Sequence, residues 1–167
     1  MNTSDQNVFT LDTAFQRRWV MKHIENNVSK AKHAKTEIEG TGITWAIFAE
    51  TINDAVVNDS SGITSAEDKR LGAYFVRESE LSKERFPEKV LKYLWDDAFR
   101  MNRTAVFSDN MKSLDLVIET YAQTPEDKLR AVLRLDMYQK MMEQMNAAKS
   151  MDQEAKESEG GATNISE

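Results

Sequence analysis

Apolar residues recur at helical spacing in four stretches of the chain. The first begins near Thr44 and stops before a cluster of turn-forming residues at 58–62. The second runs from about Pro87 to Arg100, the third from Ser113 to Ala122, and the fourth starts at Thr124. The expected buried faces are Trp45, Phe48, Ala49, Ile52 and Val56; Val90, Leu91, Leu94, Ala98 and Phe99; Leu114, Val117, Ile118 and Tyr121; and Leu129, Val132, Leu133, Met137, Met141 and Met145.

Two of these helices carry clear start signals. Ser113 suits an N-cap position, where a hydroxyl accepts from a free backbone N–H. In the fourth stretch, Thr124 is expected to cap the helix and Pro125 to occupy its first position. Glu126 and Asp127 would then meet the positive helix end. The pattern predicts a mainly α protein.

Near the start of the chain, apolar and polar residues follow a two-residue period instead of the helical one. Trp19–Ile24 alternates in the manner of a strand, and a lone strand is not stable in water. Its partners are therefore expected outside this chain. The sequence divides into four zones. Residues 1–25 contain the strand, residues 26–42 form a polar connector and residues 43–149 contain the helices. Residues 150–167 form an acidic tail that is expected to be disordered.

Composition narrows the function classes. The 167 residues include no cysteine, which excludes disulfides, thiolate metal sites and cysteine nucleophiles. The net charge of −6 argues against a dedicated nucleic-acid-binding domain. Mean hydropathy is −0.61, and neither a membrane-spanning run nor a secretion signal is evident. We expect a cytoplasmic protein that makes no contact with a membrane.

An ordered run of residues at the start of the chain carries the strongest chemical signal. It reads Met-Asn-Thr-Ser-Asp-Gln over 1–6 and Leu-Asp-Thr-Ala-Phe-Gln-Arg-Arg-Trp over 11–19. This order resembles the AAA+ NTPases of the McrB type, the motor subunits of modification-dependent restriction systems. The family has Leu and Arg where this chain has Phe15 and Gln16.

The resemblance implies roles for three residues. Asn2 matches the sensor-1 residue, whose amide orients the attacking water beside the γ-phosphate. Arg17 and Arg18 match the arginine-finger region, and either could be the finger that reaches the nucleotide of the neighbouring subunit. A planar cation there stabilises the charge of the transferring phosphoryl group. Without the rest of the run, an adjacent arginine pair usually marks a solvated helix face.

A second match covers residues 68–76, Asp-Lys-Arg-Leu-Gly-Ala-Tyr-Phe-Val, and continues over 86–107. It resembles the helical lid of the same family, where sensor 2 is placed. Lys69 or Arg70 could face a phosphate from there, and the alternative is a solvated basic pair. Asp96 and Asp97 do not suggest a metal site, because adjacent residues on a helix diverge by about 100°.

Other elements of an NTPase do not occur in the sequence. There is no Gly-x-x-x-x-Gly-Lys-Ser/Thr loop to bind phosphates and no apolar strand ending in Asp-Glu to hold Mg²⁺. We expect the C-terminal part of an AAA+ module, the end of the α/β core followed by the lid, inactive alone. The resemblance implies ATP or GTP with Mg²⁺, neighbouring subunits in a hexameric ring, a nuclease subunit and DNA as the indirect substrate.

A non-catalytic helical interaction module is the alternative. The methionine-rich stripe of the fourth helix would then bind a partner helix, although such a stripe is more often core. This interpretation needs no further domain, but it does not account for the ordered run from Asn2 to Trp19.

Overall fold

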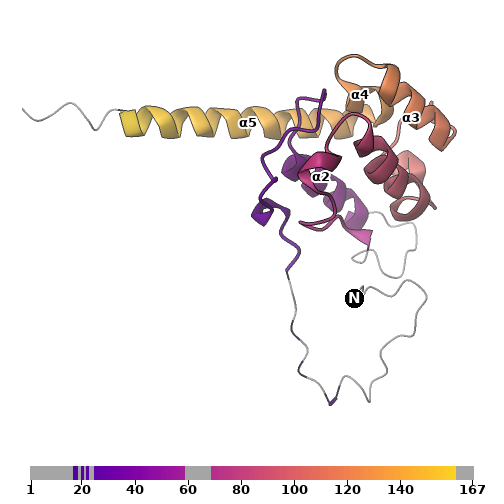
Figure 1. Ribbon diagram of the computed structural model, residues 1–167, viewed down its shortest axis with the longest axis horizontal. Coiled ribbons are helices and arrows are strands. Elements are labelled where there is room, and N and C mark those ends of the chain that lie inside the picture. Colours follow the sequence, from indigo (N-terminus) through magenta and orange to yellow (C-terminus); the bar gives the residue numbers. More distant parts are fainter. Residues whose placement is uncertain (1–16, 19, 21, 23–24, 59–68, 161–167) are drawn as a thin grey trace, which may run out of the picture.

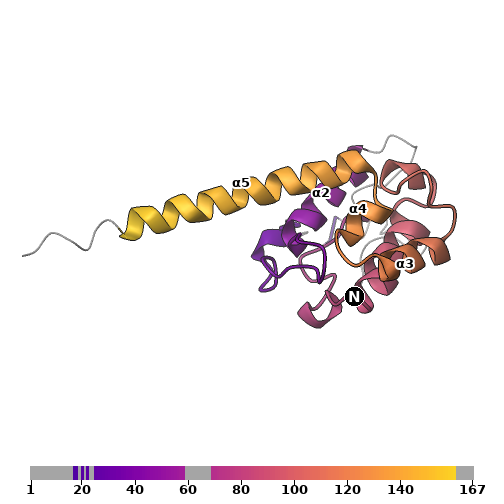
Figure 2. The ribbon, with the colours of Figure 1, turned by 90° about the horizontal axis from the view of Figure 1, so that it is seen from above.

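A long helix, α5, crosses one side of a helical body and extends well beyond it (Figures 1 and 2). The computed structural model describes residues 17, 18, 20, 22, 25–58 and 69–160. The α-helices are α2 (Trp45–Asn58), α3 (Leu114–Gln123), α4 (Lys128–Val132) and α5 (Leu135–Gly160). The described part is mainly α, as predicted, and its β pairing is limited to two isolated bridges.

Short helical turns connect these elements. They are the 3₁₀ turns η1 (Val28–Lys30), η3 (Glu78–Glu80) and η6 (Arg103–Ala105), and the π-helical turns η4 (Pro87–Leu91) and η5 (Leu94–Ala98). The two π turns lie within one helical segment over 85–98. The prediction of a helix from Pro87 is therefore confirmed, but its backbone is wider than an α-helix over most of its length.

Helix α2 forms where the first apolar stripe predicts it. All five residues of its expected face are buried, and Phe48 and Ile52 are fully enclosed. Burial of each such side chain stabilises the fold by roughly 1.5–3 kcal/mol. The helix packs against η1 and the first turns of α5.

A row of aromatic rings joins three parts of the core. The ring centroids of Trp45 and Phe48 in α2 are 6.1 Å apart, and Phe48 meets Phe86 edge to face at 5.2 Å. Phe86 stacks on Tyr121 of α3 at 5.9 Å. These contacts fix the start of the 85–98 segment between α2 and α3.

The start of α3 was predicted correctly, whereas the start of the next helix was not. Ser113 caps α3 by accepting from the N–H of Leu116. Thr124, expected as an N-cap, instead ends α3, and its hydroxyl donates to the carbonyl of Thr120 at 2.7 Å. Asp127 adopts a left-handed conformation with φ of +52°, so helix α4 begins only at Lys128.

The fourth apolar stripe is divided between two helices. Helix α4 ends at Val132, and Leu133 forms an antiparallel bridge with Phe107. The N–H of Ser108 donates to the carbonyl of Val132 at 3.0 Å, and that of Arg134 donates to the carbonyl of Val106 at 2.8 Å. The expected single helix is therefore wrong, because backbone pairing with a distant segment interrupts it.

The connector over 26–42 packs into the body and ends in a tight turn over 37–44. An antiparallel bridge between Glu37 and Thr44 closes this turn. Gly40 and Gly42 have φ of +73° and +69°, which residues with a Cβ rarely adopt. These glycines allow the chain to reverse before α2.

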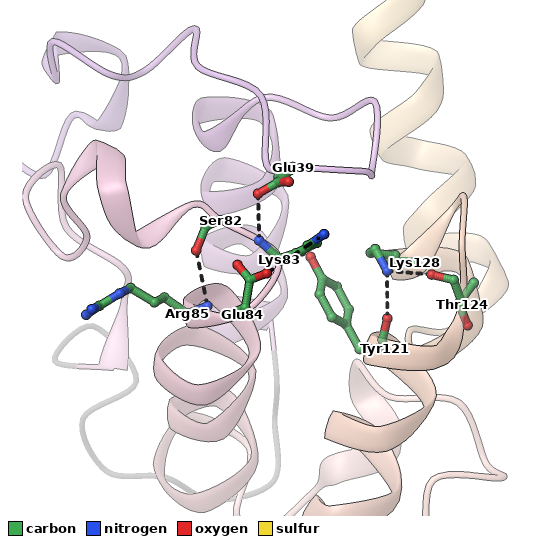
Figure 3. A network of polar contacts seen from close by, with 8 residues as sticks. All are labelled: Glu39, Ser82, Lys83, Glu84, Arg85, Tyr121, Thr124 and Lys128. Atoms are coloured by element: carbon green, nitrogen blue, oxygen red, sulfur yellow. Dashed lines mark hydrogen bonds and ion pairs between the residues drawn. The ribbon is translucent and has the colours of Figure 1, made fainter.

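The tip of this turn docks on the segment before helix 85–98. The N–H of Glu39 donates to the carbonyl of Leu81 at 3.0 Å. In return, the Glu39 carboxylate accepts from the N–H of Lys83 at 3.0 Å (Figure 3). The backbone and the side chain of Glu39 thus join two parts of the chain that are more than forty residues apart.

Lys128 closes the end of α3 from inside the core. The residue is buried, and its ammonium donates to the carbonyls of Tyr121, at 3.1 Å, and Thr124 (Figure 3). A cation is favourable at the C-terminal end of a helix, where free carbonyls gather. Burial and the nearby Glu39 carboxylate raise the pKa of Tyr121.

The structure tests the prediction for the C-terminal end of the chain more fully than the prediction for the N-terminal end. Helix α5 continues to Gly160, whereas residues 150–167 were expected to be disordered. The predicted strand over Trp19–Ile24 lies largely outside the described residues. Within the described ranges, no helix has the length and apolar character to cross a membrane.

Candidate functional site

Three of the predicted site residues lie at the start of the chain. Asn2 lies outside the described residues. Arg17 and Arg18 form a turn, and both side chains are exposed. The contacts described for Lys69 are with Asp97 and Tyr93, not with these arginines. Among the described residues, these contacts join Lys69 to the helical segment 85–98.

Lys69 is held at two points by the helical segment 85–98. Its ammonium forms an ion pair with Asp97, and the two side chains are 22% and 37% exposed. Its backbone carbonyl accepts from the Tyr93 hydroxyl at 3.0 Å. Tyr93 and Asp97 are four residues apart, so they lie on one face of the helix. This face sets both the position and the direction of Lys69.

The electrostatics of this face follow from partial burial. Burial, followed by the nearby Asp97 carboxylate, raises the pKa of Tyr93 to about 12. Tyr93 therefore stays protonated at neutral pH and acts as a donor to Lys69.

The two adjacent carboxylates of this helix point to different partners, as the helical spacing predicted. Asp97 pairs with Lys69 and Asp96 pairs with Lys92 at 2.6 Å. Among the described residues, no group of acidic and histidine side chains is arranged to hold a metal ion. The π turn η5 carries both aspartates, and such turns are frequent at functional sites.

An asparagine clamp fixes the chain just after Lys69 and Arg70. The side chain of Asn53 in α2 accepts from the N–H of Leu71 at 2.6 Å and donates to its carbonyl at 2.9 Å. Asn26 donates to the same carbonyl at 3.0 Å. Because Leu71 is fully buried, the clamp anchors the Lys69–Arg70 pair to α2.

A second ion pair continues this surface. The rings of Phe75 and Tyr93 have centroids 4.8 Å apart, and the Lys89 ammonium lies 5.9 Å from the Phe75 ring centroid. Lys89 also pairs with Glu80 at 2.6 Å. The hydrogen bond from Lys89, together with that from the Arg77 N–H, lowers the pKa of Glu80.

A large hollow lies elsewhere, where the segment 104–110 faces the start of α5. Its volume is about 580 Å³. Arg134 is its cation, but its Nε and Nη2 atoms donate to the Asp136 carboxylate, at 2.9 and 2.7 Å. That contact also lowers the pKa of Asp136. The hollow contains none of the predicted phosphate-binding residues.

Comparison with known proteins gives one informative match. The chain is similar to the "Type II restriction enzyme BsuMI component YdiS" of Bacillus subtilis (strain 168), with 37% identity over 128 residues. This chain is a homologue of that restriction enzyme component. The alignment takes in 72% of this chain and spans 36% of the length of the relative. No protein-family model matches the chain, and no solved structure does.

Sequence reasoning missed two residues that position Lys69. Asn53 faces a neighbouring segment from within an amphipathic helix, where a lone asparagine normally indicates a solvated position. Asp97 was considered as a metal ligand and not as an ion-pair partner, but it pairs with Lys69, 28 residues earlier. Neither contact leaves a local pattern, because both join segments distant in sequence.

Proposed function

We propose that this chain belongs to a motor subunit of a restriction system and completes and covers a nucleotide site there. Two observations support the proposal. The homologue is named as a restriction enzyme component. The ordered run over 1–19 independently resembles the McrB-type AAA+ NTPases of restriction systems. The homology carries the restriction context, and the run carries the NTPase assignment.

In this proposal, ATP or GTP with Mg²⁺ binds between neighbouring subunits of a ring, a hexamer in the family. Asn2 orients the attacking water, and Arg17 or Arg18 stabilises the phosphoryl group on the adjacent subunit. Lys69 and Arg70 face the phosphates from the lid. Hydrolysis drives a partner nuclease on DNA in the cytoplasm.

Two local features are consistent with these roles. The arginine pair has exposed side chains, as a residue that reaches a neighbouring subunit requires. Lys69 is oriented by contacts with the helical segment 85–98 and by the clamp on Leu71, so a phosphate would meet a cation with little freedom to lose.

The first test is to read the gene upstream of the Met1 codon. An open frame encoding a Gly-x-x-x-x-Gly-Lys-Ser/Thr loop and an apolar strand ending in Asp-Glu is the expected result. A stop codon followed by a ribosome-binding site would contradict the proposal that this chain is part of an NTPase.

The second test measures ATP and GTP hydrolysis by the protein from the complete reading frame. Of Arg17→Ala and Arg18→Ala, we expect one to lower the rate by about 10³-fold or more while nucleotide binding is retained. The other variant is the matched control, because it removes the same charge one residue away. Full hydrolysis by both variants would exclude an arginine finger here.

The alternative of a helical interaction module receives less support. Met141 and Met145, the centre of the methionine stripe, are buried in the chain's own core against α2. That stripe is therefore not available to a partner helix. A monomer of this chain that binds no nucleotide and carries no upstream frame would favour the alternative.

A further inference from the structure

The contact between Lys69 and Asp97 shows what a phosphate would have to displace. Lys69 is one of the two basic residues that could face a phosphate, but its ammonium is already paired with a carboxylate. The same helix holds the Lys69 backbone through Tyr93, independently of that ion pair. Loss of the ion pair would therefore leave the Lys69 backbone in place and free only its side chain.

The pair is suited to exchange rather than to permanent attachment. Both side chains are partly exposed, at 22% and 37%, so water and mobile ions screen their attraction. Pairs of this kind typically contribute about 0.2–1 kcal/mol. A nucleoside triphosphate carries several negative charges on its phosphate oxygens, and can compete with one carboxylate for the ammonium.

We propose that Asp97 is a positioning residue that holds the Lys69 ammonium in the empty site and yields it to a nucleotide phosphate. The proposal rests on the function proposed above. Asp97 lowers nucleotide affinity slightly, because the ion pair must break before Lys69 can bind phosphate. In return, it keeps the lysine extended in one direction.

The neighbouring ion pair provides a matched control. Asp96 pairs with Lys92 at 2.6 Å on the same π turn, with side chains 46% and 54% exposed. Asp96→Asn and Asp97→Asn therefore remove the same charge and the same type of contact, one residue apart. Only the second releases Lys69.

The experiment measures the affinity of the protein from the complete reading frame for fluorescent mant-ATP and mant-GTP with Mg²⁺. We expect Asp97→Asn to tighten binding of the accepted nucleotide by up to about fivefold, the upper end of what such an ion pair corresponds to. Asp96→Asn should leave the affinity unchanged. Asp97→Glu, which keeps the carboxylate, should behave like the wild type.

A double-mutant cycle distinguishes exchange from a purely structural role. Lys69→Met should weaken binding, and Asp97→Asn should have no further effect on nucleotide affinity in that background. Equal effects of Asp97→Asn with and without Lys69 would overturn the proposal, as would unchanged or weaker binding in Asp97→Asn. Circular dichroism of each variant shows whether a loss of binding reflects a loss of fold. If Asp97→Asn does not fold, the nucleotide affinities of Asp97→Glu and Lys69→Met decide whether the proposal holds.

Failure of this proposal is distinguishable from failure of the proposed function. If the wild type hydrolyses nucleotide and an arginine variant abolishes hydrolysis, but Asp97→Asn does not tighten binding, the exchange is excluded and the NTPase assignment stands. If the wild type binds neither nucleotide, both proposals fail.

Discussion

Gly40 lies where two constraints meet, at a backbone angle that favours glycine and against a buried lysine. Its φ is +73°, and a Cβ added there would lie 3.0 Å from Cε of Lys128. Gly42 has nearly the same angle, +69°, but no atom within 4 Å of such a Cβ. The two glycines therefore separate backbone strain from close packing.

Replacement of each glycine by alanine should show the separate costs of backbone strain and of close packing in the free energy of unfolding. Gly42→Ala should cost about 1–2 kcal/mol from backbone strain alone. Gly40→Ala should cost more, because Lys128 must move away from the carbonyls of Tyr121 and Thr124. Urea unfolding of both variants provides the measurement, and equal losses would show that Lys128 adapts freely.

Tyr93 gives the protein a specific sensitivity to alkali. Its pKa is raised to about 12 from an ordinary value of 10.0, so the folded state keeps a proton that the unfolded state releases. Its contribution to stability is present below pH 10 and is lost as the pH rises towards 12. Unfolding followed between pH 9 and 12 should show a shallower decline in Tyr93→Phe than in the wild type. An identical decline would contradict the assignment to Tyr93.

At the scale of elements, a side chain of α2 clamps the segment after Arg70. Asn53 makes two hydrogen bonds with the backbone of buried Leu71. Asn53→Ala should destabilise the protein by about 1–3 kcal/mol, because the buried N–H of Leu71 loses its partner, whereas the Leu71 carbonyl keeps the bond from Asn26. Asn58→Ala is the control, since the hydrogen bond described for Asn58 is to the Asp54 carbonyl of its own helix, at an exposed site. A loss below about 0.5 kcal/mol in Asn53→Ala would show that water replaces the clamp.

Among the described side chains of helix α5, the buried ones lie in its first turns. Met141 and Met145 are buried against the body, whereas residues 146–150 are exposed. A chain that ends at Ser150 should unfold at the same urea concentration as the complete chain. A chain that ends at Lys140 should lose several kcal/mol, because removal of each buried methionine costs about 2–5 kcal/mol. Equal stability of the two truncated chains would contradict this division.

At the scale of the whole molecule, acid should weaken the fold through its ion pairs. The pKa values of Glu80 and Asp136 are lowered by hydrogen bonds from Lys89 and Arg134. Their stabilising contributions are present above the ordinary values, 4.5 and 3.8, and are lost as the pH falls through the lowered values. Thermal melting between pH 7 and 3 should show this decline. The combined variant Glu80→Gln and Asp136→Asn should flatten the curve, and an unchanged curve would assign the decline to other carboxylates.

The sequence predicts those parts of this molecule that local patterns determine. Helices α2 and α3 follow from apolar spacing, and the cap at Ser113 follows from its hydroxyl. The break before α5 does not, because Arg134 pairs with Val106, 28 residues earlier in the chain. In the fourth stretch, the amphipathic pattern continues across that break and gives no sign of it.

The candidate site divides in the same way. The basic pair at 69–70 was found because a family pattern marks it, whereas the partners that orient Lys69 were not. Asp97 and Asn53 act through contacts between distant segments, which one sequence does not reveal. The roles of Asn2, Arg17 and Arg18 remain predictions for the hydrolysis and binding measurements described above.

The far end of α5 acts as a lever arm for the body that holds its near end. At a rise of 1.5 Å per residue, the 26 residues of α5 extend about 39 Å. A rotation of the body by about 10° would therefore sweep the tip through about 7 Å. A small shift at Met141 or Met145, where α5 packs against α2, would therefore move the tip of α5 farther than the methionine itself moves.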